Sequence, residues 1–215
     1  MINWFKHEDY SVYKNRIFNA FPKSLKGDVE AVLNILPFEI NDVRLSNEQI
    51  HKVDNLIHPS SLTIQFDDEL LTFPCRLYFN EPDKESESKL TELQKTILSC
   101  IYLRHHNGYL RQRRLENLID KSENWVTPFK LHMLGEYVFE ILQVLDNQID
   151  DKSVASYTKL ISENPKYWQQ IESRMISYWN EYYRWKFPKL KKYLGRQIAD
   201  RIKNGLHKSS LPKGN

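Results

Sequence analysis

The stretch from residue 90 to residue 145 decides the fold, and it reads LTELQKTILSCIYLRHHNGYLRQRRLENLIDKSENWVTPFKLHMLGEYVFEILQVL. Its apolar residues recur every three or four positions, which is the spacing of one face of an α-helix. Asn107-Gly108 predicts the end of a first helix, and Thr127-Pro128 predicts the start of a central one. Gly135, inside that central helix, predicts the close approach of a neighbour. We therefore expect three helices paired by short turns, over residues 90–106, 109–119 and 128–145.

The residues before this stretch predict shorter elements. Helical spacing indicates helices over residues 10–20 and 24–36. Ser46 begins a third candidate helix, whose apolar side is Ile50, Val53, Leu56 and Ile57. Residues 62–66 alternate apolar with polar and residues 71–79 are rich in strand formers, which together predict one β-hairpin with Pro74 interrupting its second strand.

The residues after it predict two further helices. Asn164-Pro165 begins a long helix rich in aromatic residues, and Phe187-Pro188 begins the last helix. The fold class is therefore mostly α, a helical bundle or stacked helical hairpins with one short β-hairpin. We expect one helical domain over residues 1–215, with a possible sub-boundary at residues 80–89, where the chain is polar and acidic.

The charge of the chain is divided unevenly. The net charge is +3, but residues 184–215 hold ten Lys and Arg against the single acid Asp200, so the other residues together carry −6. On the last helix, one side is predicted to be basic and the opposite side apolar. That basic face is one candidate binding surface, for nucleic acid, an acidic protein or an anionic membrane, although a solvated face at the edge of a bundle would look the same. Its members are Lys189, Lys192, Arg196 and Lys203.

Two acidic segments form the other candidate surface. One is the predicted hairpin turn and the other is the loop that follows the hairpin. An inhibitor of a nuclease commonly offers carboxylates that compete with nucleic acid for a basic groove, so these segments are the predicted contact for such a partner. Either segment alone would also suit an ordinary soluble loop. The candidates are Asp67, Asp68, Glu69, Glu81, Asp83, Glu85 and Glu87.

The sequence contains no recognisable catalytic or metal-binding motif, and we predict neither an enzyme nor a cofactor. Arg104-His105-His106 falls at a predicted helix end, where positive charge is favoured and adjacent imidazoles point apart. His132 and Glu136 have metal-ligand spacing but lack a third ligand. We expect a charge-assisted network that fixes how two helices pack, in which the stripe of His132 and Glu136 meets Arg111, Arg113 or Arg114.

The chain has the features of a cytoplasmic protein. Acidic residues follow Met1 before any apolar run develops, and no stretch approaches the length of a membrane span. Cys75 and Cys100 lie far apart among apolar neighbours, which predicts two buried reduced thiols.

The stretch 90–145 resembles a group of bacterial helical proteins that serve as immunity partners of contact-dependent growth inhibition and related polymorphic toxins. The resemblance rests on residues 100–111 (CIYLRHHNGYLR), on Trp125 with Pro128-Phe129, and on residues 134–138 (LGEYV). The paired helices are also similar to HEAT-type repeats, with Arg111 and Leu115 at matching positions. The resemblance implies an inhibitor that binds the C-terminal catalytic domain of its cognate toxin, often a ribonuclease that cleaves transfer RNA, and blocks its active site or substrate groove.

Three classes of function follow. An immunity protein would bind its partner one to one, without turnover. A nucleic-acid-binding protein would lose affinity steeply with salt and would use the last helix, where Trp185 and Tyr193 offer stacking beside lysines. An enzyme would hold His105, His132 or Glu136 in a pocket with a perturbed pKa. We expect the first class, with the second as the alternative.

Overall fold

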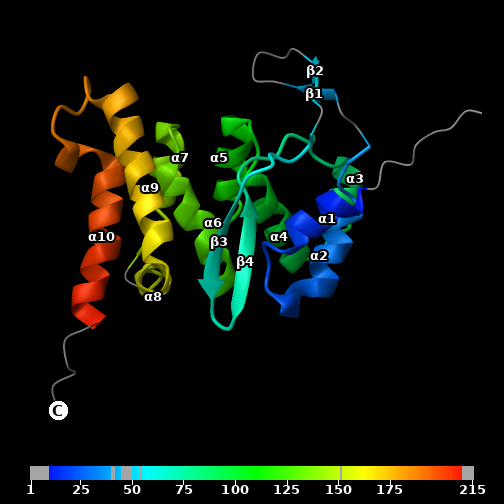
Figure 1. The fold of residues 1–215 in the computed structure, drawn as a ribbon, viewed down its shortest axis with the longest axis horizontal. Coiled ribbons are helices and arrows are strands. Elements are labelled where there is room, and N and C mark those ends of the chain that lie inside the picture. Colours follow the sequence, from blue (N-terminus) through cyan, green and yellow to red (C-terminus); the bar gives the residue numbers. More distant parts are fainter. Residues whose placement is uncertain (1–9, 40–41, 45–49, 54, 151, 210–215) are drawn as a thin grey trace, which may run out of the picture.

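The structure, a computed structural model, describes residues 10–39, 42–44, 50–53, 55–150 and 152–209. It is mostly helical with a short β-hairpin, as predicted. The elements lie roughly in a row, with the N-terminal helices at one end, the hairpin across the middle and the C-terminal helix at the other end (Figure 1). Neighbours in this row pack on one another: α2 on α4, α4 on α5, α5 on α7, and α8 on α10.

The N-terminal part contains two short helices, as predicted. They are α1 (Ser11–Phe18) and α2 (Lys26–Leu33), joined by a 3-10 turn. The predicted helix from Ser46 is wrong where the structure describes it, because Ile50–Lys52 is strand β2, which pairs antiparallel with β1 (Asp42–Arg44). Leu56 and Ile57 are buried but do not lie on a helix, and Ile57 forms a β-bridge with Leu77.

The hairpin consists of β3 (Ser61–Phe66) and β4 (Glu69–Pro74). A two-residue turn connects them, and Asp67 has a φ of 47°, a left-handed value that Asp tolerates better than most residues. Pro74 pairs with Ser61 at the end of the ladder, so it ends the second strand instead of interrupting it. The strand therefore stops short of the predicted residue 79.

Helices α3 (Lys84–Ser88), α4 (Glu92–Tyr102) and α5 (Gly108–Glu116) follow. Thr91 and Gln94 form a capping box at the start of α4, which satisfies backbone donors that the helix leaves free. Asn107 does not end α4 with a left-handed residue. Its side chain instead accepts hydrogen bonds from the backbone N–H groups of Tyr109 and Leu110, so it caps the start of α5.

The predicted central helix is broken into two. Helix α6 (Thr127–His132) passes into a 3-10 turn (Met133–Gly135), and α7 (Phe139–Asp146) begins after three residues. Glu136 at the break has an extended backbone. Gly135 does lie against a neighbour, since a Cβ there would be 3.5 Å from the backbone oxygen of Ile171. The break places Glu136 between helices, where a continuous helix would not.

The C-terminal part contains α8 (Val154–Glu163), α9 (Pro165–Tyr178) and α10 (Leu194–Ser209). A π-helical turn, Trp179–Tyr183, extends α9, and a 3-10 turn, Leu190–Lys192, precedes α10. The last helix therefore begins at Leu194 and not at Phe187-Pro188. Lys189 and Lys192 lie before it and do not share a helical face with Arg196 and Lys203.

Aromatic packing joins the parts into one hydrophobic core. The ring of Phe129 on α6 lies 5.0 Å from that of Phe21 and 4.8 Å from that of Phe73, so it connects the N-terminal helices to the hairpin. Both cysteines are free; Cys100 is buried, but Cys75 is only half-buried, contrary to the prediction. Within the described ranges, every helix is too short or too polar to span a membrane.

Candidate functional site

The acidic residues of the hairpin turn mostly have partners within the molecule. The Asp67 carboxylate accepts a hydrogen bond from the ammonium of Lys159 at 2.7 Å, and the Glu69 carboxylate accepts one from the backbone N–H of Lys23 at 3.0 Å. Asp68 is exposed and forms no hydrogen bond or ion pair with the residues that the structure describes. Of the three predicted contact residues, one is thus available.

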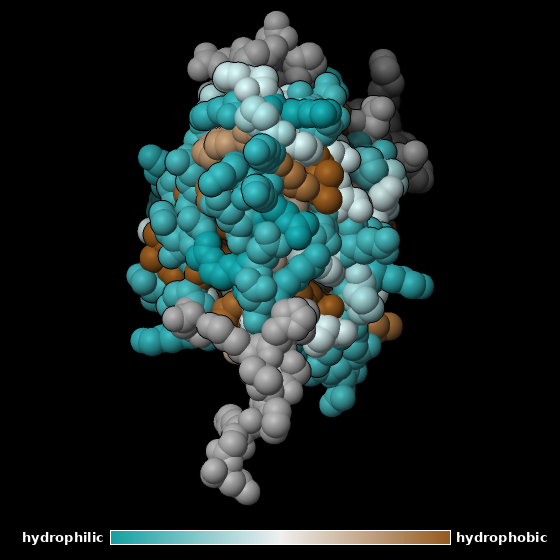
Figure 2. Space-filling model, turned by 90° about the vertical axis from the view of Figure 1, so that its left-hand side faces the viewer, coloured by the Kyte–Doolittle hydropathy of each residue, from teal (hydrophilic) through white to brown (hydrophobic). Residues whose placement is uncertain are grey.

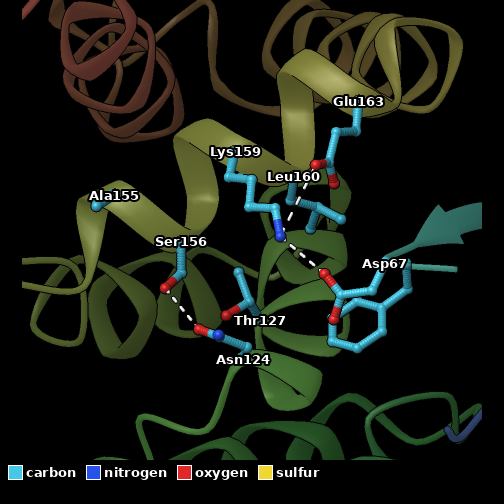
Figure 3. A pocket seen from close by; sticks show the side chains of 9 residues that line it. Asp67, Asn124, Thr127, Ala155, Ser156, Lys159, Leu160 and Glu163 are labelled. Atoms are coloured by element: carbon cyan, nitrogen blue, oxygen red, sulfur yellow. Dashed lines mark hydrogen bonds and ion pairs between the residues drawn. The ribbon is translucent and has the colours of Figure 1, made fainter. Parts of the chain in front are cut away.

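A pocket beside the turn is lined by polar side chains that bind one another. In Figure 3, Lys159 points toward both Asp67 and Glu163, and Ser156 points toward Asn124. The Ser156 hydroxyl donates to the amide oxygen of Asn124 at 2.9 Å, which is not a base that would activate it. The pocket therefore offers paired charges and an unactivated hydroxyl.

The acidic loop is also engaged. Glu81 and Glu87 both bind the guanidinium of Arg114, and Glu81 also binds Arg113. The hydrogen bond from Arg114 lowers the pKa of Glu87. Asp83 caps α3 by accepting from the backbone N–H of Ser86, and Glu85 pairs with Lys89. Arg113 and Arg114 therefore bind this loop and not Glu136, so the predicted network was wrong for these two arginines.

The predicted basic face is divided. Arg196 and Lys203 both bind the carboxylate of Glu172 on α9, and Arg196 also pairs with Asp200. Lys189 and Lys192, in contrast, are exposed and form no ion pair among the described residues. Figure 2 views this side of the molecule, which is largely hydrophilic with small hydrophobic areas. The unmatched positive charge lies before α10 and not along it.

A buried cluster of arginines surrounds Glu136, which is fully buried. The Glu136 Oε2 atom accepts from the Nη2 of Arg111 at 3.0 Å. The Oε1 atom lies 3.6 Å from the Nη1 of Arg76 and 3.9 Å from the Nη2 of Arg174, both beyond hydrogen-bond distance. The predicted contact between Arg111 and Glu136 is confirmed, and His132 is reached through Arg174, whose Nη1 is 3.1 Å from the His132 Nε2.

Arg104 completes the cluster. It is buried, and its Nε and Nη2 atoms donate to the backbone oxygens of Pro74 and Cys75 at 2.9 and 2.5 Å. Its charge interacts with those of Glu136, Arg76 and Arg174, and burial lowers its pKa to about 10. We call the four guanidiniums of Arg76, Arg104, Arg111 and Arg174, together with Glu136, the arginine cluster.

Three histidines lie against the arginine cluster and are held neutral. Burial and the neighbouring His106 lower the pKa of His105 to about 3, and burial and Arg111 lower that of His106 to about 4. Burial and then Arg104 lower the pKa of His132 well below its ordinary value. At neutral pH the cluster therefore holds four positive charges and, among the described residues, one negative charge.

An exposed aromatic and basic surface adjoins the cluster. Its aromatic members are Tyr137, Tyr182 and Trp185, whose exposed fractions are 43%, 50% and 81%. Residues 184–192 add five exposed cations, and the one acid in residues 178–193 is Glu181. We call this set the aromatic–basic surface; its cations are Arg184, Lys186, Lys189, Lys191 and Lys192.

Local contacts hold this surface in place. The hydroxyl of Tyr183 donates to the backbone oxygen of Tyr137 at 2.5 Å, which attaches the π-helical turn to the segment before α7. The rings of Tyr137 and Tyr178 lie 5.8 Å apart. The indole N–H of Trp185 donates to the backbone oxygen of Tyr182, which orients an otherwise exposed ring. Tyr193, a predicted stacking residue, is fully buried and is not part of the surface.

Comparison of the chain with protein-family models, with curated proteins and with solved structures gives no match. The geometry of the described residues is thus the basis for inferring what the protein does. Among those residues, no group of three or more His, Cys, Asp or Glu side chains is arranged to hold a metal ion.

Sequence reasoning missed most of the arginine cluster. Arg76 follows the hairpin, Arg104 follows α4 and Arg174 lies on α9, so no spacing in the sequence connects them with Glu136. The aromatic–basic surface had a local signal in the alternation of aromatic and basic residues over 178–193. The prediction named Lys189, Lys192 and Trp185 from this surface, but the amphipathic pattern of the last helix grouped the two lysines with Arg196 and Lys203.

Proposed function

We propose that the protein binds single-stranded nucleic acid on the aromatic–basic surface, without turnover. The observation that carries this proposal is the interleaving of exposed rings with five exposed cations against one acid over residues 178–193. Nucleic-acid strands are recognised by such a combination, because bases stack on aromatic rings while phosphates contact cations. Each stacked base contributes about 1–3 kcal/mol in proteins of this kind.

A protein partner is the second candidate, and the immunity function that the resemblance implies belongs here. Trp, Tyr and Arg are also the residues that dominate protein interfaces, so a toxin domain would be bound by the same surface. The acidic segments are less suited to this role than the sequence indicated. Six of their seven carboxylates bind a Lys, an Arg or a backbone N–H of the protein itself.

The proposal is tested by fluorescence anisotropy with a labelled single strand of about 15 nucleotides, near the upper site size of one binding domain. We expect binding that weakens steeply between about 50 and 200 mM salt, since phosphate contacts release counterions. Trp185→Ala should reduce affinity about tenfold or more. Leu70→Ala, at another exposed apolar residue, on the hairpin, is the matched control and should leave affinity unchanged.

The contribution of the cations to binding is tested in the same anisotropy assay. Lys189→Ala should weaken binding and make it less dependent on salt. Lys166→Ala, at the opposite end of α9, is the matched control. If no strand binds at about 50 mM salt, the first candidate is wrong. Survival of cells that express this protein together with a toxin domain encoded beside it would then support the second.

A further inference from the structure

We propose that the arginine cluster is a binding site for a phosphate monoester group. If the proposed function holds, that group is the terminal phosphate of the bound strand. The site is distinct from the aromatic–basic surface, whose cations are exposed side chains in one segment. Here the cations come from four separate parts of the chain, and three of them, Arg76, Arg111 and Arg174, lie within 3.9 Å of the Glu136 carboxylate.

The first reason is the excess of charge. Among the described residues, three guanidiniums lie within 3.9 Å of a single carboxylate and the charge of a fourth, Arg104, interacts with that carboxylate, while the three adjoining histidines are neutral at pH 7. Buried charges in proteins are ordinarily paired, because removing them from water is costly. A phosphate dianion would compensate most of the excess, whereas a carboxylate would compensate less of it.

The second reason is that hydrogen-bond donors remain unused inside the cluster. The Nη1 of Arg104 and the Nε of Arg111 are buried without a hydrogen-bond partner in the described part of the chain. Arg104 is 3% exposed and Arg111 fully buried, so bulk water does not readily satisfy them. Buried unsatisfied donors are rare in folded proteins and call for a ligand or an ordered water.

The third reason is that the outer arginines are accessible. The side chains of Arg76 and Arg174 are 21% and 35% exposed. Within the described ranges each makes one hydrogen bond, Arg76 to the backbone oxygen of His105 and Arg174 to the ring of His132, so other N–H groups on both guanidiniums can bind a ligand. Two such planar forks suit the oxygens of a phosphate.

The negative charge of Glu136 repels a phosphate, but the residue also holds the arginines in position. Its Oε2 atom holds Arg111 in place, and its Oε1 atom lies between Arg76 and Arg174 without a hydrogen bond. One carboxylate against four guanidiniums leaves the potential positive. The residue is therefore a positioning residue for the arginines.

The neighbouring rings indicate which part of a strand fits. Tyr137 follows Glu136 directly, and Tyr178 lies one turn after Arg174 on α9. The two rings contact each other at 5.8 Å. A nucleotide whose phosphate binds Arg76 and Arg174 would place its base near these rings, and the following nucleotides would continue toward Tyr182 and Trp185.

The test compares three strands of one sequence, with a 5′-phosphate, a 3′-phosphate or hydroxyl groups at both ends. We expect one phosphorylated end to bind about tenfold more tightly than the hydroxyl strand, as new charge-assisted hydrogen bonds would produce. Arg174→Gln and, independently, Arg76→Gln should remove this preference and leave the hydroxyl strand unaffected. Lys189→Gln should weaken all three strands alike. Equal affinity for all three strands would overturn the inference and leave the proposed function standing.

A parallel titration with inorganic phosphate separates the two proposals. If phosphate binds, if Arg174→Gln abolishes that binding and if no strand binds, the phosphate site stands and nucleic-acid binding fails. If phosphate stabilises the wild type and Arg174→Gln equally, the cluster is a structural feature hydrated by water and the inference fails. Circular dichroism of each variant confirms that it is folded.

Discussion

Arg111 and Arg114 lie three residues apart on α5, yet their surroundings differ in kind. Arg114 binds Glu81 and Glu87 from the acidic loop, and with Arg113 the group has two positive and two negative charges. Arg111 belongs to the arginine cluster, in which the guanidiniums of Arg111, Arg76 and Arg174 lie 3.0, 3.6 and 3.9 Å from the carboxylate of Glu136. Burial alone would lower the pKa of Arg114, but its hydrogen bond with Glu87 and the charge of Glu81 outweigh burial and raise that pKa. In the arginine cluster, burial lowers the pKa of Arg111 and lowers that of Arg104 to about 10.

The difference separates a structural ion pair from a candidate ligand site. In the balanced group each charge has a partner of opposite sign, and these ion pairs attach the acidic loop to α5. The arginine cluster has more positive than negative charge, so it needs a further anion to become balanced. The stability of the protein should therefore change when an anion that fits the cluster is supplied.

The largest effect is expected at Glu136. Glu136→Gln removes the one carboxylate of the arginine cluster and leaves the guanidiniums to repel one another. We expect the free energy of unfolding to fall by about 3 kcal/mol or more, as when one partner of a buried ion pair is removed. Urea denaturation followed by circular dichroism measures it. Glu140→Gln, at an exposed acid nearby, is the control and should change stability by less than about 0.5 kcal/mol.

A smaller effect is expected in the balanced group. Glu87→Gln leaves Arg114 bound to Glu81, and both carboxylates are partly exposed, so solvent screens the loss. We expect the free energy of unfolding to fall by about 1 kcal/mol in the same assay. A loss as large as that of Glu136→Gln would show that charge balance does not distinguish the two groups.

The third prediction concerns pH. The pKa values of His105 and His106 fall from 6.5 to about 3 and about 4 on folding, so between these values the unfolded chain binds protons that the folded one excludes. Stability should therefore decrease as the pH falls from about 6.5 toward 4. His106→Asn should make this decrease shallower, as measured by denaturation at several pH values. An unchanged slope would mean that His106 does not stay neutral on folding.

Much of the fold was predictable because its signals are local. The start of α4, the aromatic helix after Pro165 and the hairpin with its Asp67-Asp68 turn each depend on residues close in sequence. The helix expected from Ser46 failed because its apolar residues have helical spacing, but Ile50–Lys52 is strand β2 and Ile57 forms a β-bridge with Leu77. Periodicity cannot show that a segment will pair with Asp42–Arg44 instead.

The candidate site was predictable only in part. Arg111 with Glu136 was found because both lie in one stretch with a plausible helical pairing. Arg76 and Arg174 approach the same carboxylate from the hairpin side and from α9, and only tertiary packing brings them there. The break after α6, which turns Glu136 toward these arginines, was hidden by an apolar run that looks continuous.

The most direct test of the central claim, that the arginine cluster is a phosphate-binding site, is thermal unfolding in phosphate and in chloride at equal ionic strength and pH. Phosphate well above its dissociation constant should raise the unfolding temperature of the wild type by about 2 °C or more relative to chloride. Arg174→Gln should show no such difference. Equal shifts in both proteins, or no shift in the wild type, would contradict the claim.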